Sequence, residues 1–118
     1  MPAFKPGDVV RVPFPYVEIP VREVRPALVV SAAAIGPNGD MVWAVMITSS
    51  ANRGWPGDVS IEENHKAFGL PAPSVIRTEK IAVLEEGSAT RLGCVSDEIL
   101  AEVQDRIARY LGLRRNVS

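Results

Sequence analysis

The sequence has little cysteine, little histidine and almost no net charge. Cys94 is the single cysteine, so no disulfide can form within the chain, and His65 is the single histidine. The 13 lysine and arginine residues against 14 aspartate and glutamate residues leave a net charge of -1. A protein that binds duplex nucleic acid over a whole surface is expected to be strongly cationic. Any contact with nucleic acid is therefore expected at a local site.

The sequence also lacks an apolar run of membrane-spanning length, and its N-terminus has no apolar segment of the kind found in secretory signals. Hydrophobic residues make up 47% and charged residues 23% of the 118 positions, which suits one packed domain over residues 1–118. We place its core at about residues 5–112. The single thiol fits a reducing compartment, so we expect a cytoplasmic protein without membrane contact.

Ten prolines and nine glycines are spread along the chain and separate short apolar segments, as is typical of all-β domains. Strands are expected at residues 9–14, 25–31, 41–48, 58–61 and 91–95, with two strands or one bent strand over 74–78 and 80–84. One helical turn is possible at 62–68. A helix is expected after Ser96, which suits an N-cap, because Ile99, Val103 and Ile107 form one apolar stripe. The predicted fold is mainly β with a C-terminal helix.

The expected strand at 41–48 is apolar on both faces, since Trp43 and Val45 alternate with Val42 and Ala44. A strand of a single small barrel needs only one apolar face. The second face is therefore expected to lie under the C-terminal helix or in a subunit interface.

Arg25 precedes Pro26 at the start of an apolar strand. The proline favours an extended backbone at the arginine, so the planar guanidinium is presented rigidly, as a phosphate site requires. The competing interpretation is an ordinary strand-end arginine paired with Glu18 or Glu23.

Further polar groups stand at other strand ends. Thr48 and Ser49 close the 41–48 strand, where their hydroxyls can bind a ligand or their own backbone. Arg77 and Glu79 are two residues apart, so in an extended strand they would share a face with Cα atoms about 6.6 Å apart. A guanidinium and a carboxylate would then flank one phosphate. The alternative is a surface ion pair worth at most about 1 kcal/mol.

Loop residues offer additional candidate contacts to a ligand. Trp55, beside Arg53, is a candidate for stacking on a base. Glu18 and Arg22 lie in a loop over residues 16–24 that is long enough to close over a ligand. His65 lies outside all of these segments and is expected to be a plain surface residue.

Four segments in order carry a resemblance to a known family. They are residues 7–15 followed by 25–31, residues 47–49, residues 69–81, and residues 92–93 followed by Ser96. Together they resemble the MazF/PemK/Kid-type toxins of bacterial toxin–antitoxin pairs over nearly the whole chain.

The resemblance implies a homodimeric SH3-like barrel that cleaves single-stranded RNA without metal or cofactor. The reaction would use the neighbouring 2′-hydroxyl and leave a 2′,3′-cyclic phosphate. It also implies a cognate antitoxin whose acidic tail occupies the RNA groove.

By this resemblance four residues are expected to be catalytic. Arg25 would bind the phosphate, Thr48 would donate its hydroxyl to a phosphate oxygen, and Arg77 would act as acid or phosphate stabiliser. Glu79 would be the base, although family members often carry aspartate there. The candidate RNA contacts are Glu18, Arg22, Ser49, Arg53 and Trp55.

Two other interpretations keep the same fold. A catalytically silent barrel could bind a partner peptide or RNA without cleaving it. A purely structural dimer would need only the two-sided apolar strand at 41–48.

Overall fold

The computed structural model describes residues 4–13, 24–32 and 35–113. Glu18 and Arg22, two of the predicted RNA contacts, lie outside the described residues.

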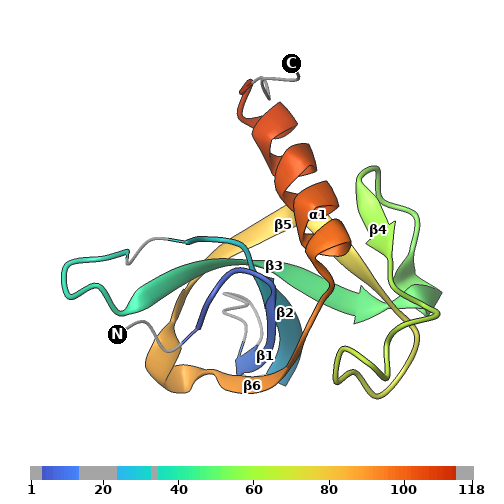
Figure 1. Ribbon diagram of the computed structural model, residues 1–118, viewed down its shortest axis with the longest axis horizontal. Helices are drawn as coiled ribbons and strands as arrows, with labels where there is room; N and C mark the ends of the chain where they lie inside the picture. The colour runs from blue at the N-terminus through green and yellow to red at the C-terminus, as the bar shows by residue number, and fades with distance from the viewer. Residues whose placement is uncertain (1–3, 14–23, 33–34, 114–118) are drawn as a thin grey trace.

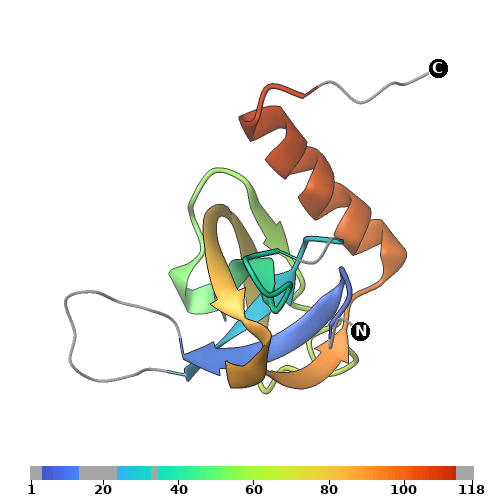
Figure 2. The same ribbon diagram turned by 90° about the vertical axis from the view of Figure 1, so that its left-hand side faces the viewer.

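The described chain forms one antiparallel sheet of six strands and a C-terminal helix (Figure 1). The elements are β1 (Asp8–Pro13), β2 (Val24–Val29), β3 (Met41–Ser49), the short 3-10 helix η1 (Ser50–Asn52), β4 (Asp58–Ser60), β5 (Ser74–Glu85), the 3-10 helix η2 (Glu86–Ser88), β6 (Thr90–Cys94) and α1 (Asp97–Tyr110). The strand order is β4-β5-β3-β2-β1-β6. The sheet curls on itself, and α1 lies on one side of it in both views (Figures 1 and 2). The predicted mainly β, SH3-like fold with a terminal helix is confirmed.

Two expectations for local structure are settled by the backbone. The segment after residue 73 forms one continuous strand, β5, rather than two. Residues 62–68 form hydrogen-bonded turns and no helix: the Phe68 N–H is shared between the Asn64 and His65 carbonyls at 3.2 Å each. Gly69 follows at φ +85°, a conformation that favours glycine and ends the segment.

The two faces of the sheet bury two separate apolar clusters, and β3 contributes to both. The helix-side core lies between the sheet and α1 and includes Val45, Ile47 and Val103. The barrel core fills the inside of the curled sheet and consists of Val10, Val12, Ala27, Val29, Val42, Ala44, Met46 and Leu84. On the second apolar face of β3, Val45 and Ile47 therefore lie in the helix-side core, as one of the two expected alternatives has it, whereas Trp43 is 42% exposed.

The helix begins and ends as its sequence predicts. The Ser96 hydroxyl accepts a hydrogen bond from the Ile99 N–H at 3.3 Å, which satisfies one of the free donors of the first turn. Gly112 follows the last turn at φ +74°, the usual C′ conformation. Tyr110 and Leu111 at this end are exposed. No helix in the described part of the chain is long and apolar enough to cross a membrane.

A bulge in β5 determines which way its residues face. Val45 pairs with Ile81, but the next residue of β3, Met46, pairs with Arg77. A step of one residue on β3 thus matches a step of four on β5. Because side chains alternate along a strand, this mismatch puts Arg77 on the barrel-core face and Ile81 on the helix-side face.

Candidate functional site

Arg25 and Arg77 lie on the same face of the sheet. Arg25 pairs with Val12, and Arg77 pairs with Met46. Directly paired residues of antiparallel strands share a face, and Val12 and Met46 both belong to the barrel core. The two arginines, 52 positions apart in the sequence (77 − 25), therefore both belong to the barrel-core face.

Thr48 belongs to the same face and stands near the same end of the sheet. Ala27 pairs with Met46, and Arg25 and Thr48 are each two residues beyond that pair on their own strand. Thr48 is buried, whereas Arg25 is half-buried. The register thus brings three of the four predicted catalytic residues to one end of one face.

The Arg77 guanidinium is held by several groups. Its Nε donates to Asp58 Oδ1 at 3.2 Å, and its Nη2 donates to Asp58 Oδ2 at 3.1 Å and to the Asn52 carbonyl at 2.6 Å. The Trp55 ring stacks on the guanidinium, with its centroid 4.4 Å from Cζ. Both side chains of the Arg77–Asp58 pair are only 9% exposed. The Arg77–Asp58 contact is therefore a buried, two-point ion pair. The sequence had suggested only a surface pair, between Arg77 and Glu79.

Asp58 is a proton acceptor of low basicity. Its burial raises the pKa, but the hydrogen bonds and charge of Arg77, together with the Gly54 and Trp55 N–H groups, outweigh burial and hold the pKa below its ordinary value. The carboxylate is therefore charged at neutral pH, with both oxygens occupied. It suits a structural role better than that of a general base.

Asn52 connects two of the predicted catalytic residues. Its side-chain amide donates to Thr48 Oγ1 at 3.1 Å, while its carbonyl accepts from Arg77. Because Thr48 Oγ1 accepts from Asn52, the Thr48 hydroxyl can direct its own proton elsewhere. Ser49 instead uses its hydroxyl locally, accepting from the Ala51 N–H at 3.2 Å to cap η1. Ser49 thus bonds its own backbone, which was the alternative to ligand binding considered for these hydroxyls.

Glu79 does not share a face with Arg77, and the expectation that it would is wrong for this chain. The β5 bulge interrupts the alternation on which that expectation depended. Glu79 is exposed and lines a hollow of about 370 Å³ on the helix side, together with Trp43 and Tyr110. Whether its carboxylate takes part in catalysis stays a prediction.

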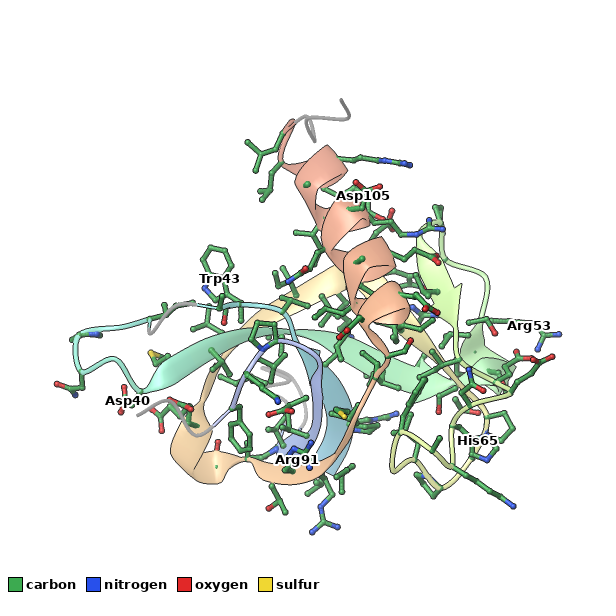
Figure 3. All side chains as sticks on the ribbon, in the orientation of Figure 1. Asp40, Trp43, Arg53, His65, Arg91 and Asp105 are labelled. Atoms are coloured by element: carbon green, nitrogen blue, oxygen red, sulfur yellow. The ribbon has the colours of Figure 1, made fainter. Side chains whose placement is uncertain are left out.

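The loop candidates are distributed over the β4 end of the molecule. The Arg53 side chain is 68% exposed, and its Nη1 donates to the Ser50 carbonyl at 3.1 Å and lies 3.9 Å from Glu62. Trp55 is half-exposed and has one ring face against Arg77. His65 is half-buried rather than a plain surface residue, because its Nδ1 lies 2.8 Å from the Glu62 carbonyl. Figure 3 shows Arg53 and His65 at this end, far from Trp43.

Asp58 and Asn52 are the site residues that the sequence did not reveal. A weak signal existed, because residues 56–58 read Pro-Gly-Asp, a turn sequence. Asp58 Oδ2 indeed accepts the Gly54 and Trp55 N–H groups at 3.3 and 3.2 Å. The bond to Arg77, 19 residues further on, depends on the pairing of β4 with β5.

The described residues contain no group of three or more histidine, cysteine, aspartate or glutamate side chains placed to hold a metal ion.

An apolar surface lies on the helix side, opposite the arginines. Trp43 is 42% exposed, and its neighbours Ile81, Val83 and Tyr110 are each about half-exposed. Two hollows, of about 450 and 370 Å³, meet at Trp43 and Ile107. We call the four exposed residues Trp43, Ile81, Val83 and Tyr110 the Trp43 patch.

Several solved structures are similar to this chain. The MazE–MazF complex from Deinococcus radiodurans has a chain with 26% identity and a TM-score of 0.71, and the match covers 93% of this chain and 96% of that one. For MazF alone from the same organism the values are 27% identity, a TM-score of 0.72, and 92% and 96% coverage. An endoribonuclease from a mycobacterial species, in complex with its cognate antitoxin, is similar in fold, with 24% identity, a TM-score of 0.72, and 96% and 99% coverage.

None of the curated protein sequences compared with this chain matches it. The family model for PemK-like, MazF-like toxins of type II toxin–antitoxin systems matches residues 5–111. That match spans nearly the whole chain and agrees with the fold. The chain therefore belongs to the PemK-like, MazF-like family of type II toxins.

Proposed function

We propose that this toxin is an endoribonuclease that cleaves single-stranded RNA by attack of the neighbouring 2′-hydroxyl, without a metal ion, and leaves a 2′,3′-cyclic phosphate. One observation carries the proposal. Thr48 and Arg77 are joined through Asn52 on the face that also holds Arg25. Two guanidinium groups and a hydroxyl there form a donor set for the charge that develops on a phosphorane.

Each group has a distinct part in the proposed reaction. Arg25 binds the scissile phosphate with its planar fork, and Thr48 donates its hydroxyl proton to a phosphate oxygen. Arg77 stabilises negative charge rather than acting as an acid, because an arginine keeps its proton. Ser49, Arg53 and Trp55 contact the flanking RNA, with Glu18 and Arg22 of the first loop.

Glu79 is the proposed base, and its position adds a requirement. Within one subunit its carboxylate faces the helix side, with Trp43 and Tyr110. It can serve the reaction only if a second subunit brings it to the site. A Glu79→Gln variant tests whether this carboxylate takes part in cleavage, with Glu85→Gln, an exposed residue at the end of β5, as the matched control. Cleavage at the wild-type rate by Glu79→Gln would exclude it as the base.

The proposed toxin works as a homodimer and is neutralised by a cognate antitoxin in the cytoplasm, where its RNA substrate is found. The Trp43 patch supports dimerisation, because a contiguous apolar surface of this kind is typical of an interface. The structures of similar toxins with MazE or a cognate antitoxin support the second partner.

A direct assay tests the nuclease. The purified chain is incubated with single-stranded RNA in excess chelator, and the product ends are analysed by mass spectrometry. We expect cleavage with a cyclic phosphate, and growth arrest on expression in bacteria without an antitoxin. Wild-type protein that leaves RNA intact would contradict the proposal.

The alternative is a catalytically silent module that binds RNA or a peptide. The observation that favours it is the pairing of Arg77 with Asp58, which already compensates the charge of one arginine. Stable RNA binding without cleavage in the same assay would support this alternative.

A further inference from the structure

The Arg77 guanidinium is bonded along one edge and open along the other. The Asp58 carboxylate accepts hydrogen bonds from Nε and Nη2, and the Asn52 carbonyl accepts a second hydrogen bond from Nη2. Nη1 bonds none of the described residues, and it is not one of the buried polar atoms that lack a partner. Nη1 therefore keeps some solvent exposure, although the Arg77 side chain as a whole is only 9% exposed.

We propose that Asp58 and Asn52 are positioning residues that clamp Arg77, so that its Nη1 edge alone meets an RNA phosphate while its Nε edge stays bonded to Asp58. The identity of the ligand rests on the proposed nuclease function. The clamp itself is a statement about the side chains of this chain.

The clamp removes the main disadvantage of arginine as a catalytic group. A free arginine side chain loses rotamer entropy when it binds a ligand. Here the two-point bond to Asp58 and the Trp55 ring have already fixed the plane of the guanidinium. Donors that are fixed before the reaction stabilise developing charge without reorganisation.

Asn52 extends the clamp to Thr48. Its side-chain amide holds Thr48 Oγ1 while its carbonyl holds Arg77 Nη2, so one residue of η1 sets the spacing between the two donors. The Asn52 carbonyl belongs to the backbone. Asn52→Ala therefore removes the bond to Thr48 and leaves the bond to Arg77.

The alternative is a latch, in which an RNA phosphate displaces Asp58 from Arg77. The surroundings of Asp58 oppose it. Its carboxylate accepts two bonds from Arg77 and one each from the Gly54 and Trp55 N–H groups. Displacement would leave those N–H groups without their acceptor, whereas the clamp keeps all four bonds.

Kinetics distinguish positioning from a merely structural role. We expect Asp58→Asn to lower kcat about tenfold to a hundredfold with a small change in KM, because a misplaced donor weakens the transition state most. In an Arg77→Gln background the same change should alter kcat less than about twofold, since the group it positions is gone. Asn52→Ala should lower kcat with the melting temperature nearly unchanged. Asp40→Asn, an exposed aspartate, is the control.

Equal losses of kcat from Asp58→Asn in the wild-type and Arg77→Gln backgrounds would overturn the clamp. So would a lowered melting temperature with normal kcat for the folded fraction.

A second measurement does not need cleavage. Arginine ¹⁵N NMR of the full chain should show the Arg77 Nε–H protected from exchange in wild type and unprotected in Asp58→Asn. Addition of a single-stranded oligonucleotide with 2′-deoxy sugars, which lacks the attacking hydroxyl, should shift the Nη signals and leave Nε protected. Loss of Nε protection on binding would establish the latch and overturn the clamp. If this ligand does not bind and unmodified RNA is not cleaved, the nuclease proposal fails, while Nε protection in the two proteins still supports or overturns the clamp.

Discussion

The two sides of β5 serve two surfaces of opposite character. Arg77 points to the barrel-core face, where Asp58 and Asn52 surround it with polar bonds. Ile81, four positions later, points to the helix side and joins the exposed Trp43 patch. The bulge between them lets one strand carry a polar site on one face and an apolar surface on the other. Substitutions on one surface should therefore leave the properties of the other unchanged.

Removing Arg25 should abolish RNA cleavage while leaving assembly intact. We expect Arg25→Ala to lower kcat about a hundredfold to a thousandfold, the usual effect of losing one donor to an oxyanion. RNA cleavage and size-exclusion chromatography measure the two properties. Arg109→Ala, which removes an exposed arginine from α1, is the control. Cleavage by Arg25→Ala at the wild-type rate would contradict the site.

Removing Arg77 should cost more stability than removing an arginine whose pair with an aspartate lies at the surface. Arg77→Ala leaves Asp58 buried without its partner, so we expect a loss of about 3 kcal/mol in the free energy of unfolding. Arg109→Ala breaks a pair with Asp105 in which the arginine side chain is 73% exposed, so its loss should be at most about 1 kcal/mol. Urea unfolding of the two variants gives the comparison. Equal losses would show that burial gives the Arg77–Asp58 pair no larger part in stability than a surface pair.

Placing a charge in the Trp43 patch should break the proposed dimer. Val83 is 50% exposed and pairs with Trp43, so we expect Val83→Lys to raise the dimer dissociation constant at least about a hundredfold by burying an unpaired charge. Light scattering after size exclusion measures the mass. Val24→Lys makes the same change at a similarly exposed valine outside the patch. An unchanged mass for Val83→Lys would exclude this surface as the interface.

Acid should weaken the Arg77–Asp58 clamp before it affects the Trp43 patch. The pKa of Asp58 in the folded chain lies below its ordinary value of 3.8, so the unfolded chain takes up this proton first. The contribution of Asp58 to the free energy of unfolding is complete at neutral pH and is lost as the pH falls through the pKa that Asp58 has in the folded chain. Wild type should therefore lose more stability than Asp58→Asn between about pH 5 and pH 3, as measured by urea unfolding. Parallel pH profiles would contradict this, and Asp40→Asn serves as the control.

The smallest expected effect is at the contact that joins the β5 bulge to α1. The Thr78 hydroxyl lies 2.9 Å from the Tyr110 hydroxyl and donates to the Gly57 carbonyl at 2.7 Å. Tyr110→Phe removes the first contact and keeps the second, so we expect a loss of about 1 kcal/mol or less in the free energy of unfolding. Thr78→Val removes both and should cost more. The reverse order would mean that the bulge is held by other contacts.

Local patterns in the sequence predicted local structure well. The strand and helix positions, the Ser96 cap and the Gly112 terminus are all found as expected. These features depend on alternation, helical spacing and capping chemistry, which involve residues close together in the chain. The two-sided apolar pattern of β3 predicted cover from α1 or from a second subunit, and Val45 and Ile47 of that face lie in the helix-side core.

The failures concern pairs that are distant in sequence or separated by an irregularity. The bulge follows from how β5 pairs with β3, and it separated Glu79 from Arg77 although only one residue lies between them. Asp58 and Asn52 are ordinary turn residues until β4 and η1 bring them against Arg77.

Local residue patterns were enough to place the strands and the terminal helix and to single out the arginines and hydroxyl of the proposed site. The side that each β5 residue faces and the acid that holds Arg77 became known only from the folded chain. The reason is physical: alternation and capping act within a few residues, whereas a bulge and a buried ion pair depend on the partner strand.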